Sequence, residues 1–293
     1  STNAPGGRAF ATTWVDSTGV FWLFGGQTVN TAGTVVTLND LWSYDPNPLS
    51  TSHPRGQQWI WAGGSPTAVN TAGIYGTQNT ASTSNYPGAR LSAQAWTDKS
   101  GNLWLFGGDG YDSAGTLGAL NDLWSYNPTT GAWTWVTGSN IQGASSVYGT
   151  QGSTVPLNGI ASMPSARVGT VGWVDVKGNL WMMAGSGADS TGTAATSDGG
   201  GALNELWVFN PTTKLWAWMG GVNIEGIAGV YVTAAPSTTP SPYNSPGARV
   251  WGTGWVDASG NFWMFGGTGL DSQGTSGYLN DLWTVQLTIQ PTN

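Results

Sequence analysis

An all-β fold built from four similar antiparallel sheets is predicted by three features of the sequence. A pattern of arginine, tryptophan and turn residues recurs four times along the 293 residues. Short apolar or alternating segments separate the turns, and such segments are typical of strands. The connections are rich in Asp, Asn, Pro and Gly, which are the residues that tight turns require. The sequence therefore predicts strands joined by turns along its whole length.

The repeat is defined by an arginine and by tryptophans at fixed distances after it. Each repeat opens with one arginine, at Arg8, Arg90, Arg167 and Arg249. A tryptophan stands six residues later in every repeat, at Trp14, Trp96, Trp173 and Trp255. The other tryptophans also stand in matching places, so that all of the 19 except Trp251 are in register. A period of about 80 residues indicates four copies of one structural unit.

Each repeat is expected to fold as a four-stranded antiparallel sheet. In the second repeat the last three strands are expected at 102–106, 122–126 and 133–135. The second strand is apolar almost throughout, as in a sheet that is covered on both faces. Such sheets packed radially make a four-bladed β-propeller, here one domain over 1–293. The blades are expected at 8–61, 90–135, 167–218 and 249–290, with long interblade loops at 62–87, 136–164 and 219–246.

Two motifs in the repeat resemble those of the kelch family. Apolar strands end in a pair of glycines at 25–26, 107–108 and 266–267, and Asn-Asp-Leu-Trp-x-Tyr follows at 39–44 and 121–126. The chain is similar to bacterial kelch-repeat proteins and to the central domain of galactose oxidase, without the residues of the oxidase. The third repeat departs from the motifs at Ala184 and Glu205, and the repeats are longer than the kelch unit of about 50 residues. The resemblance implies a propeller with a binding or scaffolding role.

Strand alternation predicts that the added length lies on one face of the propeller. The connections between the second and third strands and those between blades leave from the same face. The former are expected as long loops at 27–38, 109–120, 186–203 and 268–279. Long loops on a rigid scaffold are where binding sites tend to be built. The stretch Asp45–Gln58, with His53 and Arg55, is the exception on the short-loop face.

Composition excludes several classes of function. The chain has no Cys and one His, which rules out thiol catalysis, Cys-ligated zinc and a multi-His metal site. Eight basic against fifteen acidic side chains leave no basic face for nucleic acid. No apolar run approaches the roughly 18 residues of a membrane span. Low charge with abundant Gly, Thr, Ser and Asn suits a secreted or cell-surface bacterial protein whose signal peptide is absent from this chain.

Several loop residues are candidates for ligand contact. The motif Asp-Ser-x-Gly recurs in the loops between the second and third strands, and its acid is a hydrogen-bonded turn residue, a calcium ligand or a ligand contact. Aromatic residues outside the repeat pattern are better candidates for ligands than the repeated ones. The candidate binding residues are Asp109, Tyr111, Asp112, Asp189, Asp198, Trp251, Asp271 and Tyr278. No catalytic residue and no resident cofactor is expected.

The repeated residues are expected to be structural. The four arginines either ring a channel and bind an anion or pair with the repeated acids Asp40, Asp122, Glu205 and Asp281, and a buried charge favours pairing. The repeated tryptophans are expected to pack between blades and not to form a sugar platform. Three tyrosines of the interblade loops, Tyr75, Tyr148 and Tyr231, are expected to tie those loops down.

The fourth repeat lacks the Trp-x-Trp pair of the other three. At the matching place position 292 is Thr, which predicts that the last blade lacks its outer strand. Three explanations remain open: a longer natural polypeptide, an abbreviated strand formed by the last ten residues, or a strand shared with another subunit. The sequence predicts a non-enzymatic binding or structural module that contacts a protein partner or copies of itself. A carbohydrate-binding propeller is the alternative.

Overall fold

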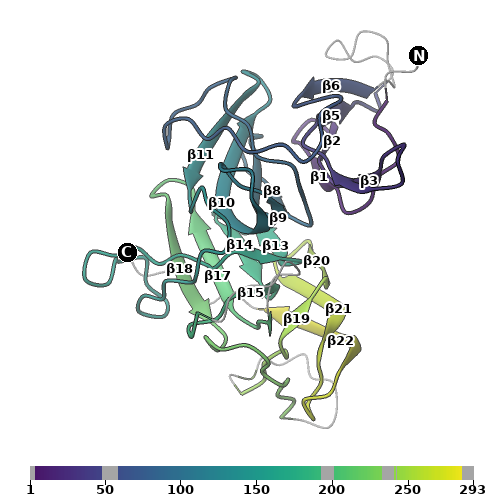
Figure 1. Ribbon diagram of the computed structural model, residues 1–293. Coiled ribbons are helices and arrows are strands. Elements are labelled where there is room, and N and C mark those ends of the chain that lie inside the picture. The colour runs from purple at the N-terminus through teal and green to yellow at the C-terminus, as the bar shows by residue number, and fades with distance from the viewer. Residues whose placement is uncertain (1–3, 48–58, 193–200, 233–240, 242, 286–293) are drawn as a thin grey trace. The chain divides into compact units, whose positions relative to one another are not determined.

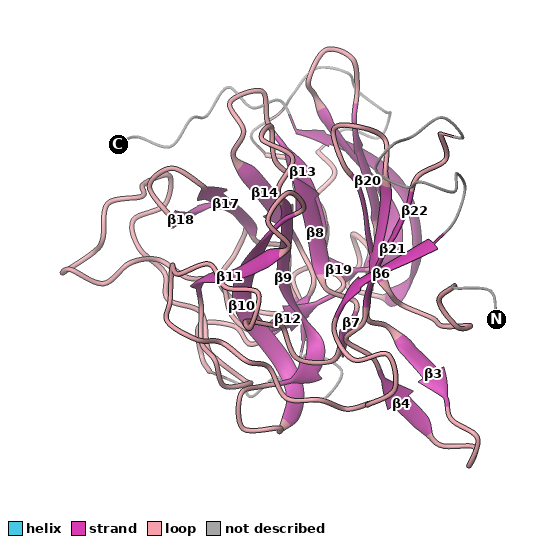
Figure 2. Cartoon of the chain, turned by 90° about the horizontal axis from the view of Figure 1, so that it is seen from above, coloured by secondary structure: helices cyan, strands magenta, loops and turns pink. Residues whose placement is uncertain are grey.

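The computed structural model describes residues 4–47, 59–192, 201–232, 241 and 243–285. The chain divides into two compact units, Ser1–Gln142 (the N-terminal half) and Gly143–Asn293 (the C-terminal half). The described residues form antiparallel strands, turns and loops, and they include no helix (Figure 2). Consequently no helix in this part of the chain has the length and apolar character to cross a membrane. His53, Arg55 and Asp198 lie outside the described residues.

The N-terminal half holds the first two repeats, each with a sheet of four main strands in sequence order. The sheet of repeat 1 consists of β1 (Thr12–Val15), β2 (Phe21–Phe24), β5 (Leu41–Tyr44) and β6 (Trp59–Gly63). The sheet of repeat 2 consists of β8 (Gln94–Thr97), β9 (Leu103–Tyr111), β10 (Leu117–Asn127) and β11 (Ala132–Thr137), with β7 (Arg90–Leu91) paired to β9. All pairings are antiparallel, and the main strands can be followed by their labels in Figure 1 and β7 in Figure 2.

The C-terminal half holds repeats 3 and 4. The main sheet of repeat 3 consists of β13 (Val171–Val174), β14 (Leu180–Met183), β17 (Leu206–Asn210) and β18 (Leu215–Gly220). The sheet of repeat 4 consists of β20 (Thr253–Val256), β21 (Phe262–Leu270) and β22 (Ser276–Val285), with β19 (Arg249–Val250) paired to β21. Repeat 4 therefore shows three main strands within the described residues. The last residues, 286–293, on which the expectation of an abbreviated strand rests, lie outside them.

The loops expected between the second and third strands are in large part β-structure, and that expectation was wrong. After the glycine pair the chain forms a second stretch of antiparallel β-pairing, which we call the inner ribbon. In repeats 2 and 4 this stretch is continuous with β9–β10 and β21–β22. In repeats 1 and 3 it is separate and consists of β3 (Gln27–Val29) with β4 (Val35–Thr37), and of β15 (Ser186–Gly187) with β12 (Arg167–Val168) and β16 (Gly201–Ala202). In repeats 1, 2 and 4 the turns at the tips, such as 112–116, remain loops, and in repeat 3 residues 193–200 lie outside the described residues.

The first tryptophan of a repeat contacts the second strand of the next repeat in the same half. The Nε1 of Trp14 donates a hydrogen bond of 2.9 Å to the carbonyl of Trp104 in β9. Trp173 stacks on Phe262 of β21, with ring centroids 3.6 Å apart and planes 11° apart. Both tryptophans are buried, and aromatic side chains bury the largest apolar areas of any residue. These tryptophans therefore join neighbouring sheets within each half.

The glycine pair that ends the second strand has a left-handed backbone in every repeat. The first member has φ near +64° at Gly25, Gly107, Gly266 and also at Ala184, which carries the only side chain among the four. A Cβ at the second member would meet backbone: at Gly108 it would lie 2.6 Å from the carbonyl oxygen of Leu91. Close approach of this kind is available only to glycine. The pair lets the strand turn sharply into the inner ribbon.

We expect Gly108→Ala to destabilise the protein by at least about 2 kcal/mol, since it combines left-handed strain with a backbone clash. Gly115→Ala is the matched control, because Gly115 is also left-handed, with φ +77°, but its Cβ would have its nearest neighbour 3.9 Å away. The control should lose only about 1 kcal/mol of strain. Urea unfolding followed by tryptophan fluorescence measures both values, and equal losses would contradict the close-approach argument.

Candidate binding site

A buried ion pair joins the arginine that opens each repeat to the repeated acid at or just before the third strand. The guanidinium of Arg90 donates to both oxygens of Asp122, at 2.6 and 2.8 Å, and both side chains are fully buried. The equivalent pairs are Arg8 with Asp40, Arg167 with Glu205 and Arg249 with Asp281. Each arginine also donates a hydrogen bond of 3.0–3.4 Å to a backbone carbonyl at the end of the second strand. The acceptors are the first residues of the glycine pairs, Gly25, Gly107, Ala184 and Gly266. The arginines therefore pair with the repeated acids, as the cost of burying a charge requires.

The same acid accepts hydrogen bonds from aromatic side chains. In repeat 2, Asp122 accepts from the indole of Trp124 at 2.7 Å and from the hydroxyl of Tyr75 at 2.6 Å. Tyr148 donates to Glu205 in the same way, and Tyr231 donates to Asp281 at 2.6 Å. These tyrosines come from the connections between repeats, so each connection is fixed to the sheet that follows it. We call the arginine, acid and tryptophan of a repeat its polar node, which in repeats 2, 3 and 4 also includes the tyrosine.

The chain segment after the fourth strand is held by three polar groups in repeat 2. The backbone N–H of Ser139 donates to Oδ1 of Asn121 at 2.9 Å, and the N–H of Gln142 donates to Oδ2 of Asp112 at 3.1 Å. In the other direction, the N–H of Ser113 donates to the carbonyl of Asn140 at 2.9 Å. This segment therefore fills a site made by the Asp-Ser-x-Gly turn and by the asparagine before the polar-node acid.

Repeat 3 uses the same three groups for the same purpose. Asn204 Oδ1 accepts from Val222 at 2.9 Å, Asp189 Oδ2 accepts from Glu225 at 3.2 Å, and Ser190 donates to Asn223 at 2.9 Å. The sequences that fill the two sites are also alike, with Gly-Ser-Asn-Ile-Gln at 138–142 and Gly-Val-Asn-Ile-Glu at 221–225. Two independent copies therefore define one docking arrangement, which we call the strand-end cradle.

The connection that precedes a repeat pairs with the outer edge of its fourth strand. In repeat 2, Ser82 forms an antiparallel bridge with Trp133, and Asn79 donates to the carbonyl of Trp135 at 2.8 Å. In repeat 3, Ser162 pairs with Trp216 in the same way. The polar-node tyrosine also packs edge-on against the second tryptophan of the strand, Tyr75 against Trp135 with centroids 5.2 Å apart. The fourth strand is thus enclosed between the third strand and the interblade loop.

In repeat 4 the cradle is present without its occupant among the described residues. The strand β22 pairs only with β21 in this part of the chain. Tyr231 is 41% exposed where Tyr75 is 5% exposed. This difference is expected when no tryptophan of a fourth strand packs on the tyrosine, as Trp135 packs on Tyr75. Within the described part of the chain, repeat 4 therefore presents an unpaired sheet edge next to an empty cradle.

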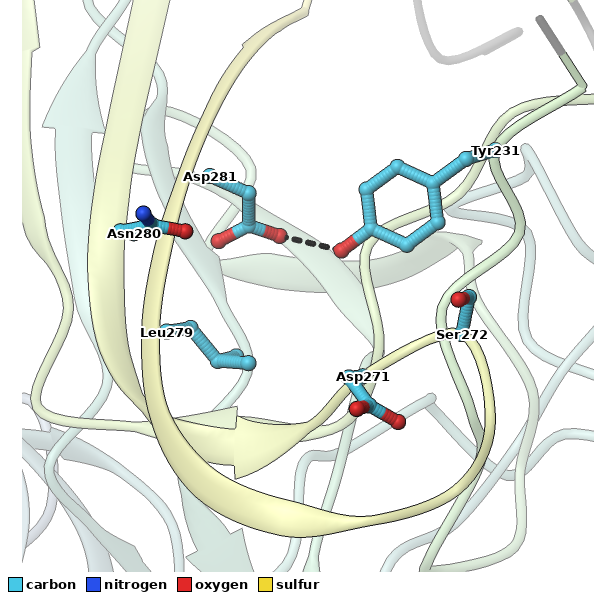
Figure 3. Close-up of a pocket in the computed structure, with 6 residues that line it drawn as sticks. All are labelled: Tyr231, Asp271, Ser272, Leu279, Asn280 and Asp281. Atoms are coloured by element: carbon cyan, nitrogen blue, oxygen red, sulfur yellow. Dashed lines mark hydrogen bonds between the residues drawn. The ribbon is translucent and has the colours of Figure 1, made fainter. Parts of the chain in front are cut away.

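A pocket of about 240 Å³ lies at the cradle of repeat 4. It is lined by Tyr231, Asp271, Ser272, Leu279, Asn280 and Asp281, as Figure 3 shows. Each corresponds to a residue of repeat 2: Tyr75, Asp112, Ser113, Leu120, Asn121 and Asp122. Of these, Asn121, Asp112 and Ser113 bind segment 138–142. Within the described residues no partner is present for the Asn280 amide, for Oδ2 of Asp271 or for the N–H of Ser272. The pocket therefore occupies the place that the strand-end segment fills elsewhere.

The structure separates the residues that the sequence nominated for ligand contact. Asp112, Asp189 and Asp271 share one role as turn acceptors: Oδ1 of Asp271 accepts from Gln273 and Thr275 at 2.8 and 2.9 Å, and its sisters bond likewise. Asp109 and Tyr111 lie in β9 within the inner ribbon of repeat 2. Tyr278 lies in β22 and is 95% exposed. Only Asp271 lines the pocket.

Trp251 occupies a repeated backbone position, although its side chain does not repeat. It stands two residues after the arginine, with φ +55°, and Phe10, Ser92 and Gly169 have the same left-handed conformation. Its N–H donates to the carbonyl of Gly169 at 2.9 Å, as Ser92 does to Phe10 at 3.0 Å. The indole itself is 57% exposed. A left-handed backbone is costly for a bulky residue, so this exposed indole is held at a strained position.

Sequence reasoning missed Tyr231, Ser272 and Asn280 as members of one site. The signal was present, because Asn precedes the acid in all four repeats and the Gly-x-Asn-Ile segment recurs after the fourth strand of repeats 2 and 3. Among the described residues no group of three or more His, Cys, Asp or Glu gathers as metal ligands would. The site is therefore built from hydrogen-bond donors and acceptors of the kind that recognise a polypeptide backbone.

Comparisons with known proteins add little to this geometry. The solved structure titled "Structure of YjhT" is similar to this chain, with a TM-score of 0.48 and 13% sequence identity, over 97% of this chain and 83% of that chain. No family model and no curated protein matches the sequence. A likeness at this level identifies neither a family nor an activity.

We expect Asp122→Asn to destabilise the protein by about 3–5 kcal/mol, because the change leaves the Arg90 guanidinium buried without a counter-charge. Asp271→Asn is the control, since Asn30 occupies the same turn in repeat 1 and accepts the same pair of N–H groups. The control should change stability by less than about 0.5 kcal/mol. Urea unfolding at neutral pH measures both, and a small loss in Asp122→Asn would contradict the structural role of the node.

Acid should weaken the polar node of repeat 4. Partial burial acts to raise the pKa of Asp281, but hydrogen bonds from Arg249, Tyr231 and Trp283 outweigh it and lower the pKa to about 2. A carboxylate whose pKa is lower in the folded state stabilises that state above its unfolded pKa of about 4 and loses this effect as the pH falls towards 2. Stability measured by urea unfolding should therefore fall between pH 4 and pH 2. The fall should be smaller in Asp281→Asn, and an identical pH profile would contradict this assignment.

Proposed function

We propose that this chain is a non-enzymatic, extracellular binding or structural module that assembles with a protein partner or with copies of itself. The single observation that carries the proposal is the fourth repeat: the described residues leave the outer edge of β22 without a partner strand beside an unfilled cradle. An unpaired edge is a template for strand addition, and proteins normally cover or blunt such edges. Strand addition gives affinity through main-chain hydrogen bonds.

We infer that the scaffold is a four-bladed, kelch-like propeller that forms one domain. Four repeats in register support this, each with an arginine, an acid and tryptophans in equivalent places. Antiparallel sheets in every repeat, and tryptophans that join consecutive sheets within each half, support it as well. Radially packed sheets protect most of their edges. A propeller of this kind would leave the edge of its last blade as the place for assembly.

The non-enzymatic part of the proposal follows from how the charged groups are used. The four repeated arginines and their acids pair with one another in the polar nodes. The acids of the Asp-x-x-Gly turns accept backbone N–H groups and the indole of a tryptophan, as Asp257 does from Trp263 at 2.9 Å. These hydrogen bonds, first that from Trp263, lower the pKa of Asp257 to about 2. General acid catalysis needs the opposite shift. The low charge and the polar surface loops suit a secreted or cell-surface location in a bacterium.

Carbohydrate binding is the second candidate, and exposed aromatic residues favour it. Trp251 is 57% exposed at a strained backbone position and Tyr278 is 95% exposed. Strained residues tend to mark functional sites, and aromatic faces are suited to stacking on apolar ligand surfaces. A glycan array probed with the wild type and with Trp251→Ala tests this candidate. Retention that disappears in the variant would support it, and an array without hits across broad glycan classes would contradict it.

Light scattering at increasing protein concentration tests the assembly proposal. We expect the mass to rise above that of one chain in the high micromolar range, since strand pairing between small sheets is weak. Leu282→Lys should suppress the rise, because a charge on the exposed edge opposes strand addition. Val176→Lys is the control at another exposed site, 73% exposed in the turn after β13. A strict monomer in the wild type would contradict self-assembly.

A further inference from the structure

We propose that the fourth repeat selects an extended segment of a second polypeptide with the pattern Trp-x-Trp-x-x-Gly. This inference deepens the proposed function and rests on it. It names the chemistry of the partner, which is the chemistry of the chain's own fourth strands. Those strands show what β22 and its cradle are built to hold.

The spacing of the two tryptophans follows from the register of the three complete sheets. The second tryptophan of the fourth strand lies opposite the tryptophan of the third: Trp61 opposite Trp42, Trp135 opposite Trp124 and Trp218 opposite Trp207. The first tryptophan of the fourth strand lies opposite the residue two positions later in the third strand, which is Tyr44, Tyr126 or Phe209. In repeat 4 the corresponding acceptor residues are Trp283 and Val285. A partner strand in this register would place its second indole beside Tyr231, as Trp135 lies beside Tyr75 and Trp218 beside Tyr148.

The glycine is required by the backbone of the cradle. In repeat 2 the residue after the strand is Gly138, with φ +87°, and its Cβ would lie 2.2 Å from the carbonyl oxygen of Asn121. Gly64 and Gly221 repeat this approach at 2.1 and 2.4 Å over the carbonyls of Asn39 and Asn204. Asn280 stands at the same place in repeat 4. Any side chain at this point of the partner would therefore collide with the backbone of β22.

Three polar groups would hold the rest of the segment. By equivalence with repeats 2 and 3, Oδ1 of Asn280 accepts the N–H of the residue after the glycine. Oδ2 of Asp271 accepts an N–H three residues beyond that, and the N–H of Ser272 donates to the carbonyl between them. Two acceptors and one donor along one stretch of backbone fix the direction and the register of the segment. The pocket of about 240 Å³ provides the space.

The test is the binding of a synthetic peptide with the sequence of residues 132–142, AWTWVTGSNIQ, to the full chain. A fluorescent label on the peptide and a titration by anisotropy give the dissociation constant. We expect saturable binding with one peptide per chain. The same peptide with Gly138→Val should bind at least about tenfold more weakly, because the added side chain meets the carbonyl of Asn280. A scrambled peptide should not bind.

Variants of the protein test the cradle itself. Asn280→Ala and Asp271→Asn each remove one acceptor, and each should weaken the peptide about tenfold. Asp271→Asn keeps the turn, as Asn30 shows in repeat 1, so its effect is not that of unfolding. Ser259→Ala, on an exposed turn elsewhere in repeat 4, should bind as the wild type does. Circular dichroism confirms that all three variants are folded.

Four results would overturn the inference. They are the absence of saturable binding at high micromolar peptide, equal binding of the Gly138→Val peptide, unchanged binding to both cradle variants, and binding only to a variant that ends at Val285. The last would mean that residues 286–293 take the site in place of a partner. The proposed self-assembly can fail while this inference holds. A strictly monomeric chain that binds the peptide would show that the cradle binds a polypeptide and that the chain does not assemble with itself. If excess peptide leaves self-association unchanged, the chain assembles through a surface other than the cradle.

Discussion

The buried arginine–acid pair is the interaction on which each repeat depends. Its guanidinium joins the short inner strand to the third strand and also to the carbonyl where the second strand ends. Its acid then accepts the indole of the third strand and the hydroxyl of the interblade loop. A buried charge is tolerated only when such partners surround it. One node therefore holds the strands of a sheet and the preceding loop in a single arrangement, and the neighbouring asparagine is positioned with it.

Much of this arrangement follows from the sequence, because the repeat presents each feature four times. The tryptophan register and the Asp-x-x-Gly turns predict the main strands, and the requirement to pair a buried charge predicts the partners of the arginines. The inner ribbon was missed, since its glycine-rich strands read as loops when strand propensity alone is considered. The left-handed position of Phe10, Ser92, Gly169 and Trp251 was also missed. Four unlike side chains carry no sequence signal for a shared backbone conformation.

The sequence predicts the incomplete sheet of the fourth repeat but not the cradle beside it. The absence of a Trp-x-Trp pair in the fourth repeat points to an incomplete sheet, whereas the cradle needs three-dimensional equivalence between repeats. Asn121 is separated along the chain from Asp112 and Ser113, and the three act together only because the hairpin brings them to one place. The filled cradles of repeats 2 and 3 then show which contacts the cradle of repeat 4 can make. We propose that the fourth repeat binds its partner through the same contacts that hold the chain's own fourth strands in repeats 2 and 3.

Hydrogen–deuterium exchange of β22 alongside β10 tests this account most directly. The two strands are equivalent, and β10 is paired on both edges while β22 has one partner among the described residues. We expect amides of residues 282–285 to exchange faster than those of 123–126, and the AWTWVTGSNIQ peptide to slow the former without affecting the latter. Equal protection of the two segments in the free protein would contradict it, because the edge of β22 would then already be covered.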